Sequence, residues 1–152
     1  MARLIYGQNH PEKYEIYAPR RFSLLFWIGP RAYRYASGKW SIKQIVGHIT
    51  DHERIKMFRA FQLSRKEEVQ LWGYDQNSLV NNSRFDELTL PQLLTDYCNV
   101  REASQSFIDT LSEDQFIIKG WARQHEVSLE DFLKSIIGHE LHHLNIIKER
   151  YL

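Results

Sequence analysis

The sequence predicts an all-α protein, a four-helix bundle that forms a single domain over residues 1–152. Three observations support this prediction. Four segments carry apolar residues at the spacing of about 3.6 that is typical of an amphipathic helix. Capping and turn residues mark where these segments begin and end. The chain of 152 residues also has the usual length of one domain with its own core.

The first two predicted helices occupy the N-terminal half of the chain. The first runs from Glu12 to about Gly29, where Gly29-Pro30 ends it, and Pro19 interrupts it because proline lacks the amide that a helix interior requires. The second begins at Ser41, an N-cap candidate, and runs to about Ser64. Turn residues replace the apolar period over 65–88, so we expect a long connection there.

The last two predicted helices lie in the C-terminal half. Thr89-Leu90-Pro91 opens the third, since proline suits the first helical position, and its apolar period continues to Leu111. A segment with Gly120 follows that can hold a short extended piece. Ser128 caps the fourth helix, which runs nearly to Leu152. Because a long connection can cross the bundle between parallel helices, the expected order is up-down-down-up.

Charge and cysteine content exclude several functional classes. The chain has 20 Lys+Arg and 19 Asp+Glu, and this balance gives no basic field for nucleic acid or anionic lipid. We find neither a signal peptide nor an uncharged stretch long enough to span a membrane. The single cysteine, Cys98, cannot form an internal disulfide, which suits a reducing compartment. We therefore expect a cytoplasmic protein without a nucleic-acid or membrane partner.

The seven histidines are the main compositional sign of chemistry. His139 and His143 are four residues apart on the fourth predicted helix, so they project from neighbouring turns of one face and can share a metal ion. His142 falls on the far side of that helix, in solvent. A metal held by imidazoles needs at least a third protein ligand.

Residues 139–143 also match H-E-x-x-H, the helix motif of zinc metalloproteases. In those enzymes the third ligand comes from downstream, but only Leu144 to Leu152 follow here, with Glu149 as the sole acid. We therefore expect the third ligand upstream and disfavour the protease interpretation. His48 and His52 of the second predicted helix both reach a suitable level along the bundle, about 6 Å apart, so spacing leaves both candidates open.

Three segments resemble the DinB-like (YfiT-related) superfamily: Gly38–Arg54, Gly73–Gln76 and Gly138–Tyr151. The most specific parts are Trp40-Ser41, eight residues before His48, and the terminal HxxxH helix. The first predicted helix matches only loosely. The resemblance implies a four-helix bundle of up-down-down-up topology that forms a homodimer and binds a divalent metal ion, Zn²⁺ or Ni²⁺.

Carried over by position, the implied metal ligands are His48, His139 and His143. The implied activity is that of a metal-dependent hydrolase, or of a transferase or isomerase that uses a low-molecular-weight thiol, acting on a small-molecule substrate. The alternative hypothesis is a non-catalytic bundle, stabilised by its metal, that acts in dimerisation or ligand binding.

Glu140 and three pocket candidates complete the expected site. Glu140 lies near the centre of an apolar stripe, where a carboxylate needs a partner. It is a candidate general base, but we favour a structural role, holding a ligand imidazole or pairing with Arg54 or another cation. His52 is a reserve ligand or supports the ligands. Tyr74 and Asp75 can reach over the site from the long connection, although Asp75 equally fits an ordinary Asx turn.

Overall fold

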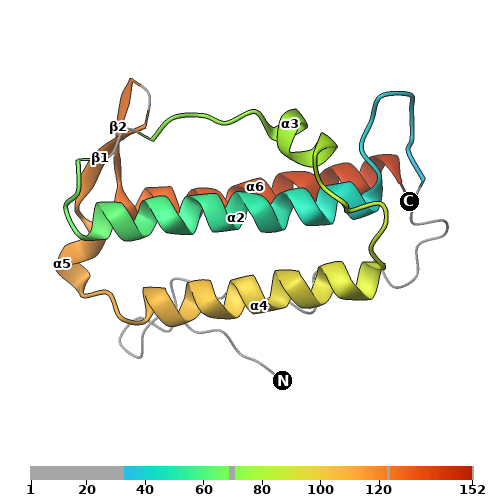
Figure 1. The fold of residues 1–152 in the computed structure, drawn as a ribbon. Coiled ribbons are helices and arrows are strands. Elements are labelled where there is room, and N and C mark those ends of the chain that lie inside the picture. Colours follow the sequence, from blue (N-terminus) through green and yellow to red (C-terminus); the bar gives the residue numbers. More distant parts are fainter. Residues whose placement is uncertain (1–32, 69–70, 123, 152) are drawn as a thin grey trace.

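The computed structural model describes residues 33–68, 71–122 and 124–151. Its framework consists of three long helices, α2 (Ile42–Ser64), α4 (Leu90–Ile108) and α6 (Leu129–Arg150). Helix α2 contacts both of the others and lies beside α6 along its length (Figure 1). The first predicted helix, from Glu12 to about Gly29, lies outside the described residues.

The three long helices begin where the sequence predicts. Ser41, Thr89 and Ser128 are their N-caps, and each side chain accepts a hydrogen bond from the backbone amide three residues further on. Helices α2 and α4 also have a glutamine that bonds back to the amide of the N-cap residue, which completes a capping box. The starts of these three helices, as predicted from their N-cap residues, are therefore confirmed.

Helices α2 and α4 run in the same direction, and α6 runs in the opposite direction (Figure 1). The connection between α2 and α4 passes along the bundle, as its length suggested. It contains a short helix that the sequence did not predict, α3 (Gln76–Asn81). Asp75 is the N-cap of α3 and accepts hydrogen bonds from the amides of Asn77 and Ser78, so its carboxylate has the Asx-turn role.

A small hairpin makes the fold mostly helical rather than all-α. After the short helix α5 (Glu113–Phe116), strands β1 (Lys119–Ala122) and β2 (His125–Ser128) pair in antiparallel fashion. This is where the sequence left room for an extended piece. A Cβ at Gly120 would come 2.8 Å from Leu63, so glycine allows the hairpin to pack against the end of α2.

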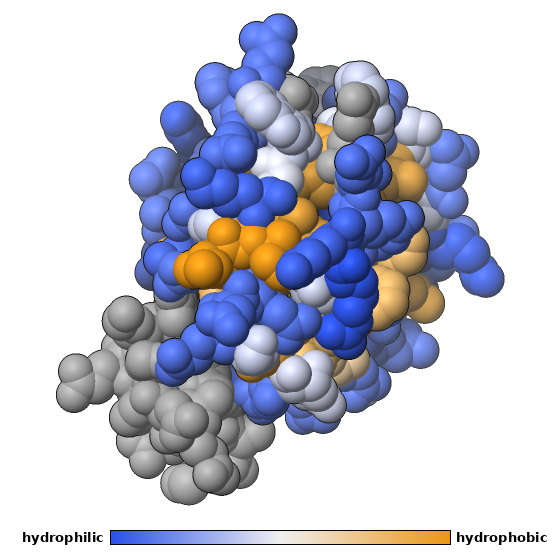
Figure 2. All heavy atoms as spheres, turned by 90° about the vertical axis from the view of Figure 1, so that its left-hand side faces the viewer, coloured by the Kyte–Doolittle hydropathy of each residue, from blue (hydrophilic) through white to orange (hydrophobic). Residues whose placement is uncertain are grey.

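The end of the bundle that carries α5 and the hairpin has apolar side chains exposed among hydrophilic ones (Figure 2). Ile117 and Trp121, which follow α5, are 70% and 56% exposed. None of the described helices is long and apolar enough to cross a membrane.

The apolar core is divided into two clusters along the bundle. On α2 the first cluster takes residues from Ile42 to Ile49, whereas the second takes Ala60 and Leu63. Helices α4 and α6 divide in the same way. The polar residues Glu53, Arg101 and Glu140 lie between these stretches on α2, α4 and α6, and all three are buried. A layer of buried charge thus separates the two apolar clusters.

The long connection is anchored on the first turns of α2, next to His48. A Cβ at Gly47 would come 2.5 Å from the ring of Phe85, so glycine at this position lets that ring lie against the helix. The hydroxyl of Ser41 donates a hydrogen bond of 2.6 Å to Asp86. These contacts fix the connection at the end of α2 where the histidines lie.

Candidate metal centre

Three histidine rings converge between α2 and α6. His48 comes from α2, and His139 and His143 come from successive turns of α6. The Nε2 atom of His139 lies 3.0 Å from that of His48 and 3.2 Å from that of His143. One ligand atom of each ring lies within 4.8 Å of the others. The structure thus places together the three residues that the resemblance assigned as ligands.

These separations fit a shared metal ion. Two nitrogens bound at 2.0–2.1 Å to a tetrahedral centre lie about 3.3 Å apart. Burial is the largest cause that lowers the pKa of His48 and of His143 to about 4, and that of His139 to about 2. All three rings are therefore neutral at pH 7, the form in which imidazole binds a metal ion.

Trp40 covers one side of the centre. Its ring lies 4.7 Å from that of His48 and is stacked at 6.2 Å on that of His143, between ring centroids. The hydroxyl of Tyr151, at the end of α6, donates a hydrogen bond of 2.5 Å to the backbone carbonyl of Trp40. The loop before α2 is therefore tied to the end of α6, which keeps the indole against this side of the centre.

His52 and Tyr74 lie on another side of the centre. The ring of His52 stacks on that of His139, with centroids 3.7 Å apart and planes inclined by 20°. Its Nδ1 atom lies 2.5 Å from the hydroxyl of Tyr74. Burial is the main cause that lowers the pKa of His52 to about 3 and raises that of Tyr74 to about 12.

Of the three pocket candidates, His52 and Tyr74 therefore border the centre, whereas Asp75 caps α3. His52 is outside the three-histidine group but supports it by stacking. The Nδ1 atom of His139 is buried and has no hydrogen-bond partner among the described residues. A ligand imidazole commonly has its orientation fixed by a hydrogen bond from its second nitrogen. Here the ring of His52 stacks on the His139 ring instead.

Glu140 takes part in a buried ion-pair network. Arg101 Nη2 donates a hydrogen bond of 2.7 Å to Glu140 and another of 2.7 Å to Glu53. The Arg101 Nε atom also bonds to Glu53, and all three side chains are about 1% exposed. Glu140 thus pairs with a cation, Arg101, as expected for the structural role. Arg54, the other cation considered, pairs on the surface with Asp51 and Asp96.

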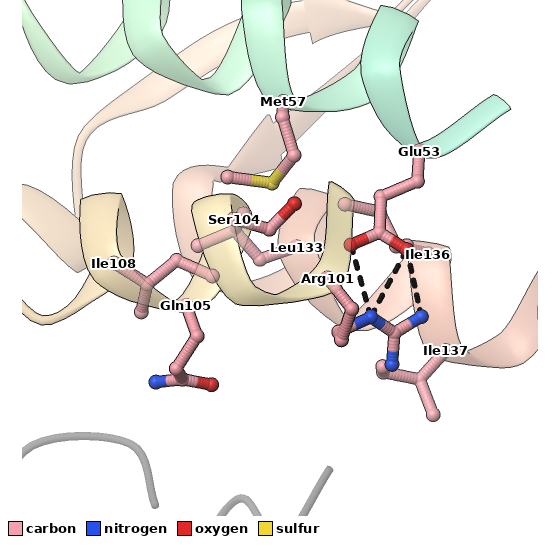
Figure 3. A pocket seen from close by; sticks show the side chains of 9 residues that line it. All are labelled: Glu53, Met57, Arg101, Ser104, Gln105, Ile108, Leu133, Ile136 and Ile137. Atoms are coloured by element: carbon pink, nitrogen blue, oxygen red, sulfur yellow. Dashed lines mark hydrogen bonds and ion pairs between the residues drawn. The ribbon is translucent and has the colours of Figure 1, made fainter. Parts of the chain in front are cut away.

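A small pocket adjoins this network. Figure 3 shows the Glu53–Arg101 pair at one end of the pocket, with side chains of α2, α4 and α6 around it. Its volume of about 10 Å³ corresponds to a single water molecule. A substrate of several atoms does not fit in this space.

Glu53 and Arg101 border the site as a buried ion pair that the sequence did not predict. Each follows an apolar core residue by four positions, Ile49 on α2 and Tyr97 on α4, and so lies on the buried face of its helix. Charges of opposite sign at apolar positions of two predicted helices are the signal that indicates a buried ion pair.

Comparisons with known proteins agree with this architecture. Residues 31–147 match the model of the DinB superfamily. The fold is similar to a solved structure of YfiT from Bacillus subtilis, described as a probable metal-dependent hydrolase with an unusual four-helix bundle topology. The TM-score is 0.73 at 19% sequence identity, over 87% of this chain and 78% of that one. A search of curated proteins gave no match. The chain belongs to the DinB superfamily.

Proposed function

We propose that this DinB-superfamily protein is a metal-dependent enzyme, a hydrolase or a thiol-dependent transferase that acts on a small molecule. His48, His139 and His143 would hold the metal ion. The observation that carries the proposal is the convergence of three neutral imidazoles on one point between α2 and α6. The similarity of the fold to YfiT supports it.

Zn²⁺ or Ni²⁺ is the proposed ion, because both suit imidazole ligands. When bound, such an ion acts as a Lewis acid that activates water or polarises a thiol or carbonyl group. The residues around the centre hold the ligand rings in position and cover them. Trp40 covers the rings of His48 and His143, and the stack of His52 on His139 holds the latter ring. The hydroxyl of Tyr74 keeps its proton at neutral pH and can donate a hydrogen bond beside the centre.

The first experiment is metal analysis of the purified protein. We expect about one metal ion per chain, and we expect His48→Ala and His143→Ala each to lose it. His142→Ala is the matched control, because this exposed histidine is next to His143 on the same helix but is not part of the three-histidine group. Full retention of metal in both ligand variants would contradict the proposed site.

A non-catalytic, metal-stabilised bundle is the second candidate. The centre links α2 to α6, so a bound ion would cross-link two helices that pack against each other. A screen of ester, amide and thiol-transfer substrates separates the two candidates. Turnover that disappears with the metal supports the enzyme. Loss of thermal stability on metal removal, without turnover on any substrate, supports the structural role.

The protease interpretation stays disfavoured, since the motif assigns Glu140 to general-base catalysis whereas this carboxylate is bonded to Arg101. Glu140→Gln should lower stability and leave the metal content unchanged. Cleavage of casein that disappears in this variant would restore the protease hypothesis. The homodimer, the cytoplasmic location and the complete up-down-down-up order, whose first helix is outside the described residues, stay predictions.

A further inference from the structure

Polar residues continue from the three-histidine centre toward the hairpin end of the bundle. On α2, His52 is followed four residues later by Lys56, and on α6, His139 is preceded by Ser135 at the same spacing. Residues four apart lie on one face of a helix in successive turns. Because the two helices are antiparallel, Lys56 and Ser135 meet, and Lys56 Nζ donates a hydrogen bond of 3.1 Å to the Ser135 hydroxyl.

Lys56 is a half-buried cation without a carboxylate partner among the described residues. Its Nζ atom lies 4.0 Å from the centroid of the Phe132 ring, and no described carboxylate is within 4.0 Å of it. Arg59, one turn further along α2 and also half-buried, has no such partner there either. In contrast, the more exposed Arg54 pairs with two aspartates. Two cations thus lie along the same strip, and neither forms an ion pair with a described carboxylate.

The electrostatic environment agrees with this geometry. Burial is the main cause that lowers the pKa of Lys56 to about 8, and the charge of Arg59 adds to the effect. The amine is nevertheless mostly protonated at neutral pH. Tyr74, which borders the strip on the side of the histidines, is neutral there because its pKa is about 12. A partly desolvated cation gains most from a ligand of opposite charge.

We propose that Lys56, Arg59 and Ser135 form a subsite for an anionic group of the substrate, a carboxylate or a phosphate, one to two helical turns from the three-histidine centre. The link to a substrate rests on the function proposed above. Lys56 and Ser135 would donate hydrogen bonds to the anion, and Arg59 would add charge. Along the helices Ser135 is about 6 Å from His139, and Lys56 is about 12 Å from His48, at 1.5 Å per residue. The substrate class is therefore an acid whose anionic group lies about 6–12 Å from the reacting atoms.

The competing interpretation is that Lys56 only packs. Its methylene chain and ammonium group lie over Phe132, and such contacts stabilise a fold without any ligand. In that case removal of the amine changes stability but not the affinity for anions. Anion binding therefore distinguishes the two interpretations, whereas a stability measurement alone does not.

The test is calorimetric titration of the full chain with inorganic phosphate and, separately, with glutarate, in both the metal-free and the zinc-loaded protein. We expect binding in both forms and an affinity at least about tenfold weaker in Lys56→Met, since a hydrogen bond to a charged group contributes about 1.5–3 kcal/mol. Lys134→Met is the matched control. Lys134 is one residue from Ser135 on α6 but pairs with Glu130 at 3.2 Å, so its loss should leave affinity unchanged.

Two further variants keep the test decisive if Lys56→Met does not fold. Lys56→Arg should keep most of the affinity, and Arg59→Gln should reduce it severalfold. Equal affinity in the wild type and in all charge-removing variants would overturn the proposal, as would the absence of binding to the wild type. Binding that requires zinc and ignores Lys56→Met would also overturn it, because the anion would then be on the metal.

The metal centre and the anion subsite can be tested independently of each other. Metal content measured on Lys56→Met should equal that of the wild type, because the variant leaves the three histidines in place. If the wild type binds no metal but still binds phosphate through Lys56, the metal centre is wrong and the anion subsite stands. Preference between phosphate and glutarate identifies which kind of acid the subsite fits.

Discussion

Two polar clusters, the ion-pair network around Arg101 and the three-histidine cluster, lie side by side along the same helices. They are built in opposite ways. Glu140 and His139 are adjacent on α6, yet one faces Arg101 and the other faces His48. In the ion-pair network two carboxylates share one cation, Arg101, and the charges are almost fully buried. In the histidine cluster, three groups of the same kind point their nitrogens at one another, without an opposite charge.

The difference indicates which cluster is suited to bind an ion from solution. In the Glu53–Arg101–Glu140 network one guanidinium is shared by two carboxylates, and hydrogen bonds between residues of the chain hold the charges in place. The histidine cluster has lone pairs that a cation can use. The same contrast explains why the H-E-x-x-H motif does not imply a protease here. Its histidines face the centre, whereas its glutamate is turned into the core.

The largest expected effect comes from breaking the buried ion-pair network. Arg101→Leu leaves two buried carboxylates without their cation, and we expect a loss of about 3–5 kcal/mol in the free energy of unfolding, measured with urea. The matched control is Arg54→Leu, which removes a surface arginine with two aspartate partners and should cost less than about 1 kcal/mol. Similar losses in the two variants would mean that the network is not a special source of stability.

Metal removal tests the other cluster. A ligand present at 100 times its Kd stabilises the folded state by about 2.7 kcal/mol, so zinc at that excess should raise Tm by several degrees. His143→Ala should abolish this rise, and His142→Ala should keep it. Arg101 does not contact the centre. The mild substitution Arg101→Lys should therefore leave the zinc-dependent rise in Tm unchanged. A zinc-dependent rise in Tm that is equal in His143→Ala and in the wild type would contradict the role of His143 as a metal ligand.

Acid should weaken the metal-free protein through the histidines. Burial lowers the pKa of His48 and His143 to about 4 in the folded state, against about 6.5 in the unfolded chain. Between these values the unfolded state binds more protons, so stability is full above pH 6.5 and falls as the pH drops toward 4. Each such group contributes at most about 1.4 kcal/mol per pH unit.

Urea unfolding at several pH values checks this slope. His48→Gln should show a shallower decline between pH 6.5 and 4 than the wild type, because one imidazole no longer takes up a proton on unfolding. If the free energy of unfolding of His48→Gln falls with pH as steeply as that of the wild type, His48 titrates normally in the folded protein.

The smallest expected effect concerns the support of the centre. Tyr74→Phe removes the hydroxyl next to His52 Nδ1, which should cost about 1 kcal/mol of stability and leave metal content unchanged. Tyr33→Phe is the control, since Tyr33 is 49% exposed. Loss of metal in Tyr74→Phe would instead make Tyr74 and His52 part of the metal centre itself.

The sequence by itself determined the starts of the three long helices and the spacing of the histidines. Both are local properties. An N-cap bonds to an amide three residues away, and two histidines four apart share a helix face whatever lies opposite. The hairpin between α4 and α6 was visible only as a segment without a helical period. The short helix α3 gave no periodic signal because its six residues make fewer than two turns.

Only the tertiary structure decided which residues meet across helices. Spacing left His48 and His52 both open, and Glu140 had several candidate partners. The contacts that settle these questions join residues far apart in the sequence, 91 positions for His48 and His139 and 39 for Arg101 and Glu140. The rotation of one helix against another sets which side chains face each other. Packing of the two apolar clusters fixes that rotation, and no local pattern in the sequence encodes it.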